Sequence, residues 1–269
     1  ASIPIALSLF HTSFNIINTL LLIGFVNFIA RTVVRMVPSR GDDEEFRLEH
    51  IGHSVIRTPD ISILEARKEL AKFGEITRRM AIFDRELLDK KKSKKISKLL
   101  NRVAKYEEIT DRIEVEVAAF LSKASGGNIS EVTSTKIIAL LSINNELERL
   151  GDILYEVSLG IARKREDKEW FTDDQKKGLE DMFELLDEAF NVLIENLNAD
   201  YSKVNIELAI EKENKINAKR NDLRRKHLKK IEKNTYDIQS SMIYSDLFNL
   251  LERAGDHIMN IQENIVGEV

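Results

Sequence analysis

Hydrophobic residues recur along most of the chain with the spacing of amphipathic helices. From residue 60 onward they repeat every three or four positions, which predicts helices over 60–91, 94–124, 130–167, 172–199, 201–233 and 236–265. The clearest heptad series is Leu140, Ile143, Leu147, Leu150, Leu154, Val157 and Ile161. The pattern predicts an all-α domain over residues 59–269, built of two tandem, pseudo-symmetric three-helix bundles, 59–168 and 169–269.

Breaks between these segments agree with that division. Pro59 begins the first helix, and the pair Gly126-Gly127 ends the second. Thr172 and Gln175 have the spacing of a capping box, which predicts the start of the second bundle. No proline follows Pro59, so the later helices contain none of the residue that most strongly interrupts helices.

The first 37 residues have a different pattern. No charged residue precedes Arg31, and between Phe14 and Ala30 the strongly polar residues are three asparagines. About 20 such residues span a bilayer, so we predict a transmembrane helix over residues 1–37 and a linker over 38–58. The arginines follow the apolar run, whereas a signal peptide carries them before it. They place residues after about 40 in the cytoplasm, beneath the inner (plasma) membrane.

This N-terminal helix also carries a polar stripe. Ser8, His11, Asn15 and Asn18 fall on one helical face. Within lipid such a face must meet protein or water, so it is either a helix-packing seam or the lining of a substrate path. Both interpretations require membrane helices that the sequence does not supply.

Composition excludes several kinds of function. The net charge is −4, with 41 basic and 45 acidic residues, which is not typical of a nucleic-acid-binding protein. We interpret the basic runs 90–95 and 224–230 as solvated helix ends, although the first could face anionic lipid. Cysteine is absent, so any metal site must use oxygen or imidazole ligands.

A repeated motif contains the candidate metal ligands. Residues 147–152, Leu-Glu-Arg-Leu-Gly-Asp, return at 251–256 as Leu-Glu-Arg-Ala-Gly-Asp, an offset of 104. A second pair of oxygen-bearing side chains lies one helix earlier in each half, with an offset of 106. The two pairs of the first half are called the first station, and those of the second half the second station. The four i, i+4 pairs are Glu107 with Asp111, Glu148 with Asp152, Glu213 with Asn217, and Glu252 with Asp256.

The repeat favours metal binding over ordinary surface charge. Converging carboxylates raise one another's pKa values, and a divalent or trivalent cation removes the repulsion. The alternative is that each pair is a solvated helix face stabilised by Arg149 or Arg253. Gly151 and Gly255, in the middle of their helices, indicate close approach of a neighbouring helix or a ligand. His257 is a possible ligand that the first half does not repeat.

Two stretches resemble known families. The motifs LERLGDI and LERAGDHIMNI resemble the E-R-x-G-D signature of PhoU-domain proteins, which implies tandem three-helix bundles, multinuclear iron or zinc sites and a role in phosphate homeostasis. The resemblance carries over to three of the four pairs, because Asn217 stands where the family has aspartate. ALSLFHTSFNIINTLLLIGF and RTPDISILEARKEL resemble the last membrane segment and following linker of bacterial sodium/phosphate cotransporters.

These resemblances imply a metal-binding regulatory domain at the end of a sodium-dependent phosphate transporter. The chain lacks the Gln-Ser-Ser segments of the transport core, so we expect a fragment that cannot transport phosphate alone. Its expected partners are the membrane, the missing transporter helices, a regulatory protein and further copies of itself. A stand-alone PhoU-type adaptor is the alternative. An enzyme is disfavoured, because no histidine stands at Glu-x-x-His spacing from the stations.

Overall fold

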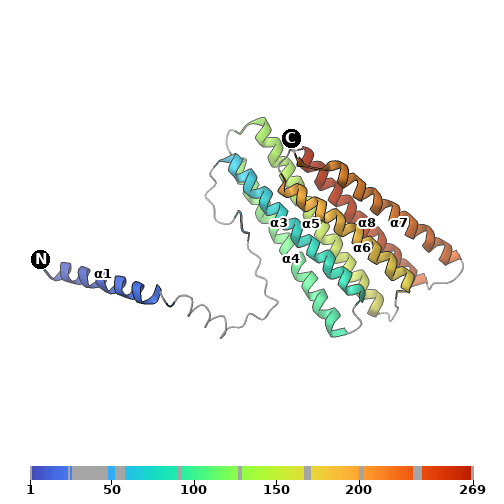
Figure 1. Ribbon diagram of the computed structural model, residues 1–269, viewed down its shortest axis with the longest axis horizontal. Helices are drawn as coiled ribbons and strands as arrows, with labels where there is room; N and C mark the ends of the chain where they lie inside the picture. The colour runs from blue at the N-terminus through green and yellow to red at the C-terminus, as the bar shows by residue number, and fades with distance from the viewer. Residues whose placement is uncertain are drawn as a thin grey trace. The chain divides into compact units, whose positions relative to one another are not determined.

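The computed structural model describes residues 2–23, 25, 48–51, 58–89, 93–126, 129–166, 171–199, 203–232 and 238–267. The chain divides into two compact units, Ala1–Phe46 and Arg47–Val269, so the division falls within the predicted linker. All regular secondary structure in the described ranges is helical, which confirms the all-α prediction. The elements are α1 (Ser2–Ile23), α3 (Pro59–Asp89), α4 (Ser93–Ala124), α5 (Glu131–Glu166), α6 (Asp173–Asn198), α7 (Ile206–Glu232) and α8 (Ile238–Gly267) (Figure 1).

The predicted transmembrane helix is not found in the described part of the chain. Its first part forms α1, and most of residues 24–37 lie outside the described residues. Among the helices that can be assessed, none is both long and apolar enough to cross a membrane. The polar stripe of Ser8, His11, Asn15 and Asn18 lies on α1.

The larger unit contains two groups of three helices. Helices α3, α4 and α5 pack on one another, as do α6, α7 and α8. The groups join where α5 packs along α8 and α3 packs along α6 (Figure 1). The predicted heptad seam forms the centre of the first group, since each of its members is at most 1% exposed: Leu140, Ile143, Leu147, Leu150, Leu154, Val157 and Ile161.

Contacts between the groups show that α5 and α8 run antiparallel. Gly160, late on α5, faces Leu247, early on α8. Glu146, early on α5, binds His257, late on α8. Between α3 and α6 the same antiparallel arrangement is held by ion pairs, one of which joins Arg78 Nε to Asp187 Oδ1 at 2.7 Å and another Arg85 to Glu184 at 2.6 Å.

Local signals explain where the second group begins and where one boundary prediction was wrong. The Thr172 hydroxyl accepts a hydrogen bond from the Gln175 backbone, and the Gln175 side chain accepts one from the Thr172 backbone, which confirms the predicted capping box.

Helix α7 begins at Ile206 rather than near 201. The reason is that Asn196 holds the Asn205 backbone at both its N–H and its carbonyl, and the Asn205 side chain then accepts from Leu208 N.

Candidate metal site

Three of the predicted acidic residues converge in the first half of the repeat. Glu107 and Asp111 of α4 and Asp152 of α5 each offer a carboxylate oxygen, and these oxygens lie within 4.8 Å of one another. The two helices approach closely because Gly151 has no side chain. A Cβ atom there would lie only 3.0 Å from the hydroxyl of Thr110, which directly precedes Asp111.

The electrostatics of this cluster favour a cation. Partial burial raises the pKa of Glu107, and the charges of Asp111 and Asp152 raise it further. Burial also raises the pKa of Asp152, with Asp111 as the main charged neighbour. Mutual repulsion of this kind is what a bound divalent ion removes, and three carboxylates supply the hard oxygen ligands that Mg²⁺, Ca²⁺, Mn²⁺ and iron accept.

Glu148 lies beside the cluster rather than within the group of three. Burial raises its pKa most, and the charges of Asp152, Asp111 and Glu114 raise it further, while Arg149 lowers it. Glu148 is therefore within electrostatic reach of the same two aspartates. Glu114, whose charge also raises the pKa of Glu148, is a fifth acidic side chain nearby.

The second half of the repeat is built differently, and the site expected there stays a prediction. No group of metal-ligating side chains within the described ranges includes Glu213, Glu252 or Asp256. Arg220 forms an ion pair with Glu252, and the Asn217 amide donates to Glu213 Oε1 at 3.0 Å. Asp256 keeps a raised pKa, chiefly through burial and then through Glu252 and Glu213, although His257 and Arg220 oppose the rise.

The difference follows from two substitutions between the repeats. At the offset of 106, Asn217 replaces Asp111, and Arg220 replaces Glu114. The second station and its surroundings therefore have two carboxylates fewer and an internal guanidinium that neutralises part of the remaining charge. The glycine contact is nevertheless repeated, because a Cβ at Gly255 would lie 3.0 Å from Ile216, the residue equivalent to Thr110. Backbone geometry is retained while the ligand set is not.

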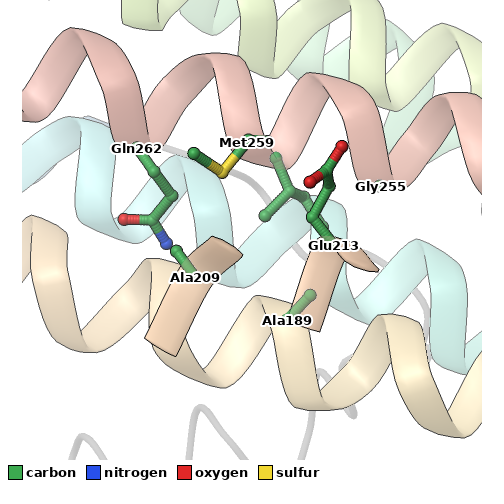
Figure 2. Close-up of a pocket in the computed structure, with 7 residues that line it drawn as sticks. Ala189, Ala209, Glu213, Gly255, Met259 and Gln262 are labelled. Carbon is green, nitrogen blue, oxygen red and sulfur yellow. The ribbon is translucent and has the colours of Figure 1, made fainter. Parts of the chain in front are cut away.

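Beside Glu213 the second half has a small cavity where α6, α7 and α8 meet. Figure 2 shows Met259 and Gln262 of α8 and Glu213 of α7 around it, with Ala189 on α6 forming part of the wall. Its volume of about 10 Å³ has room for roughly one water molecule. The Gln262 side chain accepts from Asn196 at 2.8 Å, and its amide nitrogen has no partner among the described residues, so that nitrogen is a ready donor to such a water.

His257 is engaged elsewhere. Its Nδ1 lies 2.8 Å from Glu146 Oε2, and the Asn260 amide donates to the same oxygen at 2.9 Å. These contacts tie α8 to α5 across the junction between the two groups. They give His257 a structural partner at the edge of the second station.

Comparison with known proteins identifies the kind of helical domain that the chain contains. Residues 179–265, which cover most of α6 to α8, match the PhoU domain. The chain contains a PhoU domain. The proposed inorganic phosphate export protein YjbB of Escherichia coli and that of Shigella flexneri are each 22% identical to it over 183 residues, which make up 66% of this chain and 32% of theirs. The chain thus spans about a third of the length of these curated relatives.

Solved structures extend the likeness over more than three quarters of the chain. The phosphate transport system regulatory protein PhoU from Streptococcus pneumoniae superposes with a TM-score of 0.65 at 17% identity, covering 78% of this chain and 95% of that one. PhoU from Pseudomonas aeruginosa gives 0.66 at 14% identity, with coverage of 77% and 96%. At these identities the likeness establishes the fold, which is that of the PhoU proteins.

Proposed function

We propose that this chain is a regulatory PhoU domain of a phosphate-transport protein and that its first acidic station binds a metal ion. The observation that carries the metal assignment is the convergence of Glu107, Asp111 and Asp152 from two helices onto one point. The regulatory role is supported by the PhoU domain itself and by the PhoU structures with the same fold. The role proposed is binding and regulation rather than catalysis.

The metal proposal differs between the halves of the repeat. The first station offers three close carboxylates with Glu148 beside them, and multinuclear iron or zinc, manganese, magnesium and calcium are all candidates for such ligands. In the second, Arg220 already supplies positive charge to Glu252. We therefore propose one metal site per chain, formed by α4 and α5.

The test is metal content, measured by elemental mass spectrometry on protein purified without chelator. Wild-type protein should retain metal, and the pair Glu107→Gln with Asp152→Asn should lose it. The matched control is Glu116→Gln with Glu131→Gln, which removes two exposed carboxylates from the same two helices. Loss of metal in both pairs, or in neither while the helical content is unchanged, would refute the site.

A second comparison separates the halves. Glu252→Gln with Asp256→Asn removes the acids of the second station, and the metal content should stay within error of the wild-type value. An equal loss from both stations would show that the two sites are equivalent, contrary to the role assigned to Arg220.

We further propose that residues 1–46 connect this domain to the membrane part of a phosphate transporter, of the sodium-dependent kind that their sequence resembles. Support comes from α1, whose large apolar side chains are 55–69% exposed and need a covering partner: Leu7, Leu9, Phe10, Phe14, Ile16, Ile17 and Leu21. In the complete protein, Glu107→Gln with Asp152→Asn should change the rate of phosphate transport by vesicles without changing the amount of protein. An unchanged rate would favour the alternative, an adaptor that acts through protein contacts alone, as the near-complete coverage of the separate PhoU chains suggests.

A further inference from the structure

A basic groove lies on the second group of helices, away from the acidic stations. It runs between the start of α6 and the end of α7, with Tyr244 of α8 in its wall, and its volume is about 480 Å³. That volume is typical of a small-molecule site. Five lysines and two aspartates line it: Lys177, Lys219, Lys226, Lys229, Lys230, Asp174 and Asp181.

The ion pairs inside the groove neutralise only part of its positive charge. Asp174 binds Lys230 at 2.6 Å and Asp181 binds Lys219 at 2.5 Å, so both aspartates are already engaged. Lys177 and Lys229 are exposed and form no ion pair with any residue in the described ranges. Lys226 pairs with Asp222 at 2.6 Å, so Lys177 and Lys229 are the two lysines of the groove without a carboxylate partner among the described residues.

A buried donor also lies in the wall. Gln175 is 2% exposed, and its Oε1 is occupied by the capping box with Thr172. Its Nε2 has no hydrogen-bond partner among the described residues. A buried amide N–H without a partner costs free energy, and an acceptor oxygen in the groove would recover it.

The shape of the groove depends on Gly178, one turn after the start of α6. A Cβ at this position would lie 2.7 Å from the Tyr244 hydroxyl and 2.8 Å from Leu223. The absence of a side chain therefore lets Tyr244 and Leu223 form the floor of the groove. The N-terminus of α6 lies at the same end, where Asp173 and Asp174 in its first turn offset the helix dipole.

We propose that the basic groove binds an anion that carries several linked phosphoryl groups. The ligand class follows from the donor set, which consists of ammonium groups and an amide N–H. The preference for several phosphoryl groups follows from the placement of the donors, because the unpaired Lys177 and the Gln175 amide N–H lie on α6 whereas the unpaired Lys229 lies on α7, around a cavity of about 480 Å³. A single orthophosphate fills a small part of that volume, whereas a condensed phosphate or a nucleoside triphosphate reaches donors on both helices. The site is separate from the metal station.

The experiment is isothermal titration of the purified chain with sodium tripolyphosphate, ATP, orthophosphate and sulfate at constant ionic strength. Tripolyphosphate or ATP should bind more tightly than orthophosphate or sulfate. Lys177→Glu with Lys229→Glu should weaken binding by about tenfold or more, since charge-assisted hydrogen bonds are lost and like charge is introduced. The matched control, Lys94→Glu with Lys95→Glu, makes the same charge change on exposed residues of α4 and should leave binding within about twofold.

A second variant tests the buried donor. Gln175→Glu keeps the acceptor needed for the capping box but replaces the amide N–H with a carboxylate, so it should also abolish binding.

The titrations are repeated with Glu107→Gln and Asp152→Asn present, which separates the groove from phosphate held by a bound metal; binding to the groove should persist. Equal affinity for ATP and tripolyphosphate identifies the phosphate chain as the recognised part, and tighter ATP binding identifies a nucleotide. Absence of binding by both, or equal weakening in the α4 control, would overturn the proposal.

Discussion

Asp84 provides the sharpest test of the electrostatics of this fold. Its side chain lies on α3 in the first group of helices, is fully buried, and has no hydrogen-bond partner for either oxygen among the described residues. Burial raises the pKa of Asp84 well above 3.8, the ordinary value for aspartate. The folded protein therefore holds this carboxyl group in its neutral form at a pH where the unfolded chain has ionised it.

The sign of the effect follows from proton binding. Between the unfolded pKa of about 3.8 and the raised folded pKa, the folded state binds more protons than the unfolded state, so stability falls as pH rises. The slope approaches about 1.4 kcal/mol per pH unit for one proton. Asp84→Asn keeps the size and removes the ionisation, so the variant should lose this slope and become more stable than wild type as pH rises.

The assay is urea unfolding followed by circular dichroism at several values between about pH 4.5 and 7.5. The difference in unfolding free energy between Asp84→Asn and wild type isolates this group from the other carboxylates. Glu75→Gln, an exposed position on the same helix, should give a curve parallel to that of wild type. A parallel curve for Asp84→Asn as well would show that Asp84 has a partner or is solvated, and the reasoning would fail.

Three further predictions concern the stations and the second group. Changing Asn217→Asp together with Arg220→Glu restores the ligand types of the first half, so it should add a second metal equivalent by elemental analysis; no gain would mean that the backbone also differs. Because the pKa values of Glu107 and Asp152 are raised above 4.5 and 3.8, protons compete with the metal, and metal affinity measured by calorimetry should rise with pH above these ordinary values, whereas a flat profile would contradict these pKa shifts. Thr172→Ala removes the α6 capping box and should cost about 1 kcal/mol in urea unfolding, with Thr172→Ser as the conservative control; equal stability of both would show that the cap contributes little.

The helices of the larger unit were predictable because the apolar spacing and the capping residues act locally. The heptad seam of α5 and the Thr172 capping box needed no knowledge of neighbouring helices. The first station was also predictable, since Glu107 and Asp111 share one face of α4 by spacing alone. Gly151 gave the further signal that another helix approaches at that level.

The second station could not be settled in the same way, because its partners come from another helix. The sequence suggested Arg253 as the neutralising charge, yet Arg253 is exposed and Arg220 of α7 pairs with Glu252 instead. The offset of 106 aligns Arg220 with Glu114, and this change from an acidic to a basic residue was the signal in the sequence that Arg220 neutralises the second station. The buried Asp84 and the basic groove depend on tertiary packing that no spacing rule describes.

The ion pair of Arg220 with Glu252 has a consequence for how the duplicated halves respond to their surroundings. The C-terminal half carries its own permanent counter-ion, so its acidic face is balanced whatever the ionic composition of the cell. Among the described residues of the N-terminal half, Glu107, Asp111 and Asp152 converge and no basic side chain forms an ion pair with them. If the first station binds metal as proposed, scarcity of metal leaves the repulsion among these three carboxylates unbalanced in one half only, and the α5–α8 junction lies between that half and the other.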